Sequence, residues 1–109
     1  MLKVKKIRSE KHRRFVASLP CVVTGSPDVQ CAHIRKNNGG GLGLKPCDSF
    51  CVPLSCREHY IQGQIGEEPY WKPYGGIEKA TELAKALFSV SGNREAAMEI
   101  IFAWRGHGR

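Results

Sequence analysis

The stretch that decides the fold runs from Cys21, with the Leu-Pro before it, to His59, and it holds three chemically distinctive segments. They read Leu-Pro-Cys-Val-Val-Thr-Gly at 19–25, Cys-Ala-His-Ile-Arg at 31–35 and Val-Pro-Leu-Ser-Cys-Arg-Glu-His at 52–59. All five cysteines of the chain and two of its four histidines lie in this stretch. Thiolate and imidazole ligands at two separated points, joined by a short loop, are what a metal-clamped unit of two strands and a helix requires. The sequence therefore predicts an α+β fold with a ββα-metal core.

The length of the chain favours a single domain, residues 1–109, with modest material for an apolar core. A chain of 109 residues lies near the size at which one hydrophobic core becomes adequate. A structural metal ion would add stability to such a domain. We expect the core at residues 20–66 and a helical brace at residues 67–105, with one helix before the core and two after it.

The composition also indicates where in the cell the protein is located. No apolar run is long enough to span a bilayer, and the basic N-terminus lacks the apolar stretch of a signal peptide. An odd number of cysteines without a secretion signal argues against a disulfide framework and for reduced thiols. We therefore expect a cytoplasmic protein that has no membrane partner.

The formal net charge of +7 predicts a polyanionic partner, and nucleic acid is the commonest polyanion inside cells. The alternative is a merely soluble basic protein, but the positive charge is clustered along the chain rather than dispersed. A glycine-rich loop flanked by basic side chains suits phosphate contacts, although such loops are often only flexible connections. The candidate DNA-binding residues are Arg13, Arg14, Arg35, Lys36 and Lys45. The helical periodicity of the first helix leaves Arg13 and Arg14 toward solvent.

Local signals place the regular elements. We expect a β-hairpin formed by a strand at 21–24 and a strand at 29–34, with turn residues between them. Alternation along the second strand puts Cys31 and His33 on one face, and Ala32 and Ile34 on the other. Helices are expected after the N-cap Ser9, at 56–64 after the N-cap Ser55, at 77–90, and at 94–105 after the N-cap Asn93.

The spacing of Cys56 and His59 on one helical face forms a Cys-x2-His half-site for zinc. The first half-site is incomplete, because Cys21 is followed three residues later by Thr24 rather than by a second cysteine. Cysteine and histidine also occur separately as core residues, so a half-site alone leaves the metal open. The candidates to complete a four-ligand zinc site are a water molecule, Cys31, Cys47 and Cys51.

His33 and Asp48 lie on either side of the glycine-rich loop. In a nuclease, a histidine at the position of His33 would deprotonate a water molecule aimed at a phosphodiester, with a divalent ion polarising the phosphate. Asp48 could orient the imidazole or bind the ion. The alternatives are a histidine hydrogen-bonded within the hairpin and a turn aspartate that bonds to its own backbone.

The three segments, together with Lys-Pro-Cys-Asp at 45–48 and Gly-Glu-x-x-Tyr-Trp at 66–71, occur in one order. In this order they resemble the small HNH proteins of phages and prophages, including the RecA-dependent phage nuclease. The resemblance covers residues 12–71. It implies a ββα-metal fold that cuts or nicks DNA with Mg²⁺ or another divalent cation, in the cytoplasm of a bacterial host cell.

The resemblance also implies roles for individual residues. His33 falls on the histidine that activates water, and Asp48 falls near the middle member of the HNH motif. Cys21, Cys56 and His59 fall on positions used for structural zinc. His59 is also the residue that could replace a missing ligand of the catalytic ion.

The chain departs from the family pattern at positions that hold the catalytic ion, where it has Ala32, Tyr60 and Gln64. Two functions therefore remain open. The first is a metal-dependent DNA endonuclease or nickase with His33 as base, Asp48 as orienting residue and His59 as metal ligand. The second is a catalytically degenerate ββα-metal module that binds DNA or a recombination partner without cleaving. A basic helical protein without a metal is a third reading.

Overall fold

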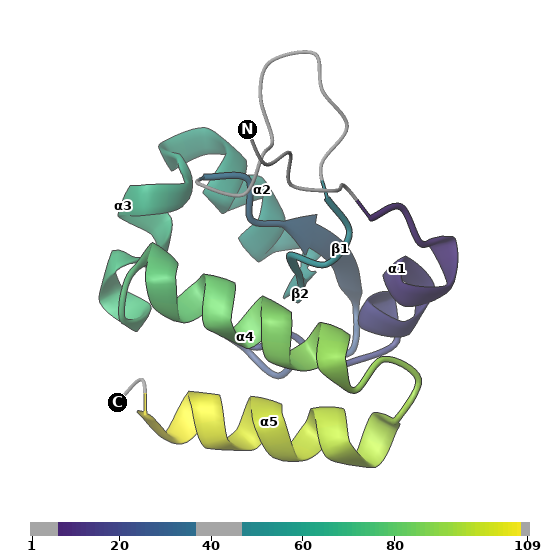
Figure 1. The fold of residues 1–109 in the computed structure, drawn as a ribbon. Helices are drawn as coiled ribbons and strands as arrows, with labels where there is room; N and C mark the ends of the chain where they lie inside the picture. The colour runs from purple at the N-terminus through teal and green to yellow at the C-terminus, as the bar shows by residue number, and fades with distance from the viewer. Residues whose placement is uncertain (1–6, 37–46, 108–109) are drawn as a thin grey trace, which may run out of the picture.

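The computed structural model describes residues 7–36 and 47–107, which form an α+β arrangement (Figure 1). An N-terminal helix is followed by a two-stranded antiparallel sheet and then by a series of helices. In chain order the elements are α1 (Glu10–Ala17), β1 (Val29–His33), β2 (Cys51–Ser55), α2 (Cys56–Ile65), α3 (Glu67–Trp71), the 3₁₀ turn η1 (Lys72–Tyr74), α4 (Ile77–Ser89) and α5 (Arg94–His107).

The sheet pairs β1 with β2, in a register that runs from Val29 opposite Ser55 to His33 opposite Cys51. Every residue of β2 is buried, whereas β1 alternates near its end, with Ala32 buried and His33 partly exposed. The predicted alternation of faces along this strand is therefore confirmed. It sets the imidazole of His33 on the face of the sheet opposite to Ala32.

The predicted strand at 21–24 is wrong, and so is its pairing with the strand at 29–34. Residues 22–24 form a turn, closed by the Gly25 amide, which donates to the Cys21 carbonyl oxygen at 2.8 Å. This turn lies beside β2, where the Val22 amide donates to the Pro53 carbonyl oxygen at 3.0 Å. The more apolar segment, Cys51–Ser55, takes the place in the sheet because it can be buried over its full length.

The helix starts follow the predicted caps. The side chains of Ser9, Ser55 and Asn93 accept hydrogen bonds from backbone amides three residues further along, at 3.1, 3.2 and 3.1 Å. The predicted end of the last helix at Gly106 is wrong, because α5 continues to His107. One glycine costs a helix only about 1 kcal/mol relative to alanine, which is too little to stop it.

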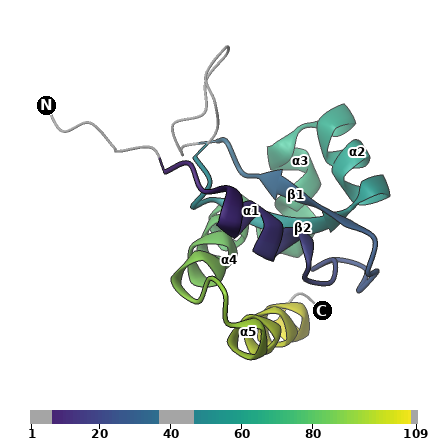
Figure 2. The same ribbon diagram turned by 90° about the vertical axis from the view of Figure 1, so that its right-hand side faces the viewer.

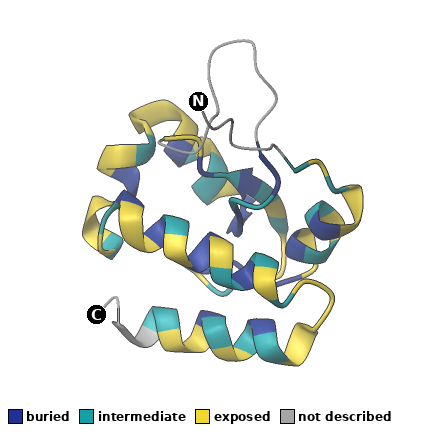
Figure 3. Cartoon of the chain, viewed as in Figure 1, coloured by how far each residue is buried: buried dark blue, intermediate teal, exposed yellow. Residues whose placement is uncertain are grey.

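The core lies between the sheet and the helices. α4 packs on β2, and α5 packs on α4 on the side away from the strands (Figures 1 and 2). Buried positions concentrate on the inward faces of these helices (Figure 3). Trp71 is fully buried and its indole N–H donates to Gln62 Oε1 at 2.7 Å, so this aromatic side chain is part of the core. Within the described residues, no helix has the length and apolar character needed to cross a membrane.

Candidate functional site

The site is built around Asp48, which lies in the turn before β2 and is fully buried. Its Oδ1 accepts from Arg8 Nη1 at 3.1 Å and lies 2.8 Å from His33 Nε2. Its Oδ2 accepts from the Ser9 amide at 2.7 Å and from Arg13 Nη1. Burial opposes ionisation, but the hydrogen bonds from His33, Ser9 and Arg13 outweigh it and hold the pKa of Asp48 below its ordinary value.

The ionised carboxylate of Asp48 assigns the tautomer of His33. A carboxylate can only accept hydrogen bonds, so Nε2 of His33 carries the proton that is donated to Oδ1. In the neutral imidazole the lone pair is then on Nδ1. The arrangement fixes the ring and leaves Nδ1 able to accept a proton.

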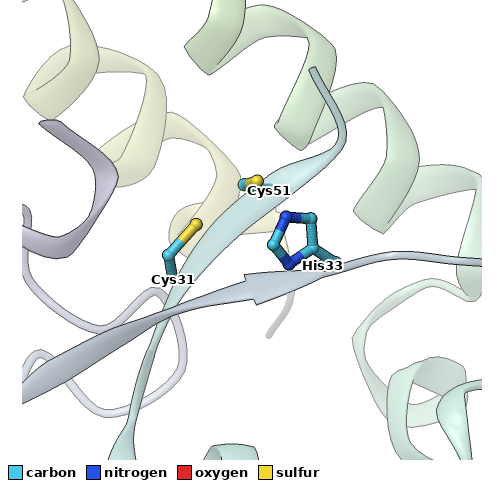
Figure 4. Close-up of side chains that lie close together, drawn as sticks. All are labelled: Cys31, His33 and Cys51. Carbon is cyan, nitrogen blue, oxygen red and sulfur yellow. The ribbon is translucent and has the colours of Figure 1, made fainter. Parts of the chain in front are cut away.

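Two thiols lie beside this imidazole (Figure 4). Cys31 precedes His33 by two residues on the same face of β1, and Cys51 lies opposite His33 in β2. The ligand atoms of the three residues all lie within 4.8 Å of one another. Two sulfur atoms and one imidazole nitrogen form a donor set that zinc prefers. Cys31, His33 and Cys51 could therefore hold a metal ion such as zinc.

The two thiols of this cluster ionise unequally. The hydrogen bond from Cys51 lowers the pKa of Cys31, although burial opposes the shift. The hydrogen bond to Cys31, together with burial, raises the pKa of Cys51, whose Sγ also lies 3.2 Å from the Asp48 carbonyl oxygen. Cys31 therefore loses its proton first. Because zinc binds thiolates, its affinity for the cluster should rise with pH.

The cysteines of the predicted zinc set lie elsewhere. Cys21 is buried, and its Sγ accepts from the Thr24 amide at 3.5 Å. Cys56 is exposed, with its Sγ 3.9 Å from Asp28 Oδ1. Across residues 7–36 and 47–107, Cys21, Cys56 and His59 do not form a three-ligand group. The chain thus brings together two of the recruits considered from sequence, Cys31 and Cys51, rather than the predicted half-sites.

His59 lies on α2, with Nδ1 2.7 Å from Gln30 Oε1 of β1. Burial lowers its pKa, and the charge of His33 adds to this effect. The two imidazoles therefore lie close enough for their charges to interact. Cys47, the third recruit considered, is buried with its Sγ 3.0 Å from Ser49 Oγ.

The predicted DNA-binding arginines of α1 differ in their surroundings. Arg14 is exposed and pairs with Glu10 at 3.4 Å, as an i, i+4 pair on the helix surface. The prediction that Arg13 faces solvent is wrong, because its guanidinium pairs with the buried Asp48. A long side chain can leave the polar face of a helix when a buried carboxylate lies within reach.

The predicted cations after β1 are partly neutralised by acidic residues. Arg35 and Lys36 are both exposed, and Lys36 Nζ pairs with Glu68, which raises the pKa of that lysine. The carboxylate of Glu67 accepts from the backbone amides of both residues. Lys45 lies outside the described residues.

Sequence reasoning missed two features: the pairing of Arg8 and Arg13 with Asp48, which we call the arginine clamp, and the closeness of Cys51 to His33. The clamp has no local signal, since Arg8 and Asp48 are separated by 40 residues. The cysteine cluster had a partial signal, because Cys31 and His33 alternate on one strand. Its third member depends on which segment pairs with that strand.

The fold and the site together define a class: α+β proteins in which an antiparallel strand pair carries a carboxylate-oriented histidine beside two cysteines. The chain belongs to the family described as "Protein of unknown function (DUF968)", whose model matches residues 1–87. It is 39% identical over 66 residues to "Uncharacterized protein YdfU" of Escherichia coli (strain K12). That match covers 61% of this chain and 19% of the relative, so the chain spans about a fifth of that protein's length. No solved structure matches the chain.

Proposed function

We propose that this protein is an HNH-type DNA endonuclease or nickase, with β1, β2 and α2 as its ββα-metal core. The observation that carries the proposal is the hydrogen bond between His33 and the buried Asp48. A histidine held by an ionised carboxylate is a general base whose orientation and protonated form are both stabilised. His59 lies on α2, the helix of this proposed core, and its Nδ1 contacts Gln30 Oε1 of β1, the strand that carries His33.

The chain's own residues would act as follows. His33 accepts the proton of a water molecule at Nδ1 as the water attacks the scissile phosphorus, and the 3′ oxygen leaves. Asp48 holds the ring and stabilises the imidazolium that forms. A divalent cation, held with the help of His59, would supply polarisation of the phosphate when it is bound.

Positive charge would provide most of the DNA affinity. The chain carries a formal net charge of +7; the exposed Arg14 lies on α1, and the exposed Arg35 and Lys36 follow β1 closely. Neutralising phosphates releases counterions, so affinity should fall steeply as salt rises. The same charges would serve either of the two functions under consideration.

A second function, a zinc-bound module that binds DNA or a recombination partner without cleaving, is favoured by a separate observation. The donor atoms of Cys31, His33 and Cys51 lie within 4.8 Å of one another, and an imidazole that binds a zinc ion is not free to accept a proton from water. Ala32 is buried on the opposite face of β1, and Tyr60 is 67% exposed. These residues offer little to a catalytic cation, since alanine has no donor and tyrosine is a weak ligand for a divalent ion.

A plasmid-nicking assay with Mg²⁺ or Mn²⁺ separates the two functions. The nuclease proposal expects nicking by the parent protein, a loss of at least about 100-fold in His33→Ala, and retained nicking in Cys31→Ser. The binding-module proposal expects no nicking by any of the three proteins, and loss of both zinc and DNA affinity in Cys31→Ser. Equal nicking by the parent and by His33→Ala would remove His33 from catalysis.

A further inference from the structure

The backbone amides that follow β1 form a small anion-binding nest. The Arg35 amide donates to Glu67 Oε2 at 2.8 Å and to Oε1 at 3.1 Å, and the Lys36 amide donates to Oε1 at 2.9 Å. Two consecutive amides thus hold one carboxylate through both of its oxygens. Successive backbone N–H groups that converge in this way bind anions of several kinds, phosphate among them.

The nest lies directly beside the candidate site. Arg35 comes two residues after His33, and its side chain and that of Lys36 are exposed. A cleft of about 590 Å³ opens next to it, and its lining carries two lysines, Lys36 and Lys72, and two glutamates, Glu68 and Glu78. The cleft is large enough for a phosphate and part of its sugar.

Acidic residues of the chain cover the cations and amides of this region. Glu67 occupies the two amides, and the neighbouring Glu68 pairs with Lys36 Nζ. Both glutamates lie in the first turn of α3, at 67–68, so they approach the end of β1 from one segment. Side-chain rotation alone would free the amides, without any rearrangement of the fold.

We propose that the amides of Arg35 and Lys36 are a subsite for a nucleic-acid backbone phosphate, and that Glu67 occupies this subsite in the free protein. A phosphate offers the same pair of anionic acceptors as a carboxylate, and donors to an anion form stronger bonds than donors to a neutral group. DNA binding would displace Glu67 and place a phosphate near His33. The inference rests on the proposed DNA-binding function. It adds the position of one bound phosphate and names Glu67 as the group that competes with that phosphate.

The test compares Glu67→Gln with Glu99→Gln by fluorescence anisotropy on a short DNA duplex at low ionic strength. Glutamine keeps an oxygen that can accept from the amides, so the nest should persist without the competing charge. Removing a charge next to a bound phosphate is worth about 1 kcal/mol in water, so Glu67→Gln should bind DNA about fivefold more tightly than the parent. Glu99 is exposed on α5 and changes the net charge equally, which makes it the matched control.

Equal affinities for Glu67→Gln and Glu99→Gln would overturn the subsite. A second measurement uses the parent protein alone, so it does not depend on the folding of a variant. In NMR spectra, the amide resonances of Arg35 and Lys36 should shift when DNA is added, and unchanged resonances would overturn the proposal. If no protein binds DNA, the proposed function fails. The subsite is then tested with inorganic phosphate, which should shift the same two amides in Glu67→Gln, and the absence of that shift overturns the subsite as well.

Discussion

The imidazole of His33 and the carboxylate of Asp48 are joined by a 2.8 Å contact between Nε2 and Oδ1, across the connection between the two strands. The same carboxylate holds Arg8 and Arg13 from the N-terminal segment. One buried group therefore ties the start of α1 to the sheet and orients the candidate base. Stability and site geometry depend on the same atoms.

Replacing Asp48 with asparagine should lower the free energy of unfolding by about 2–4 kcal/mol. The change keeps the shape of the side chain but removes the charge that two arginines and one histidine face, and it leaves those donors poorly paired. Urea unfolding of the purified variant measures the loss. Asp28→Asn, at an exposed loop position, should stay within about 0.5 kcal/mol of the parent. Similar values for the two variants would contradict the central role of Asp48.

Asp48 should also make the protein sensitive to acid. Its pKa is lowered in the folded protein, so the unfolded chain takes up the proton first as the pH falls. The stability that Asp48 contributes is fully present above about pH 5 and is lost as the pH falls through the folded pKa, below about 4. The stability difference between the parent and Asp48→Asn should therefore shrink from pH 5 toward pH 2, as urea titrations at several pH values would measure. A constant difference would show that Asp48 is not ionised by preference in the folded state.

His12 gives a second pH dependence in a different window. Its Nδ1 lies 2.7 Å from Ser91 Oγ, its edge meets Phe88, and its buried Nε2 has no hydrogen-bond partner within the described part of the chain. Burial lowers its pKa, partly opposed by the charge of Asp48, so the unfolded chain binds the proton more readily. Stability should fall as the pH drops from about 7 through the folded pKa.

The variant His12→Leu tests this second window. Leucine removes the unpaired nitrogen, so the stability at pH 7 should stay within about 1 kcal/mol of the parent. The loss of stability between about pH 7 and pH 5 should become smaller than in the parent. His59 also has a lowered pKa, so it contributes to the pH dependence of stability in the same range. The variant His59→Gln measures that contribution separately. An unchanged slope in His12→Leu would assign the pH dependence to other groups.

The sequence predicts helices well and strand pairing poorly, for physical reasons. Caps such as Ser9, Ser55 and Asn93 act within one turn, so a local pattern is sufficient to place a helix start. The partner of β1 is β2, and it is selected by burial across the whole domain. Residues 21–24 are closer in sequence and are followed by turn residues, so on local evidence they resemble the first strand of a hairpin. Pairing over a long connection leaves no such local mark.

The same distinction explains the candidate site. The pairing of Asp48 with His33 was among the predicted alternatives, because both flank one loop and carry complementary chemistry. The closeness of Cys51 to Cys31 follows from the register of β1 with β2 and could not be derived before that register was known. Arg13 was assigned to solvent by helical periodicity, which gives the direction of a side chain but not its reach.

The cysteine cluster leads to the last prediction, which concerns metal content. If the second function holds and the protein is a zinc-bound module, it should bind zinc through Cys31, His33 and Cys51, whose donor atoms are already within 4.8 Å of one another. Cys31→Ser and Cys51→Ala should each lower the zinc affinity by more than about tenfold. Even the loss of a residue that only supports a ligand costs about this much, and these variants remove a ligand itself. Competition with a chromophoric chelator measures each affinity.

The control for this prediction is Cys56→Ser. Cys56 is exposed, belongs to the zinc set implied by the family resemblance and lies outside the observed cluster, so this variant should keep the parent's zinc affinity. The parent's affinity should also rise with pH, because both thiols must lose their protons to bind the ion. If Cys21→Ser and Cys56→Ser lost zinc while Cys31→Ser kept it, the ion would belong to the predicted half-sites. His33 would then be free of metal and available as a base.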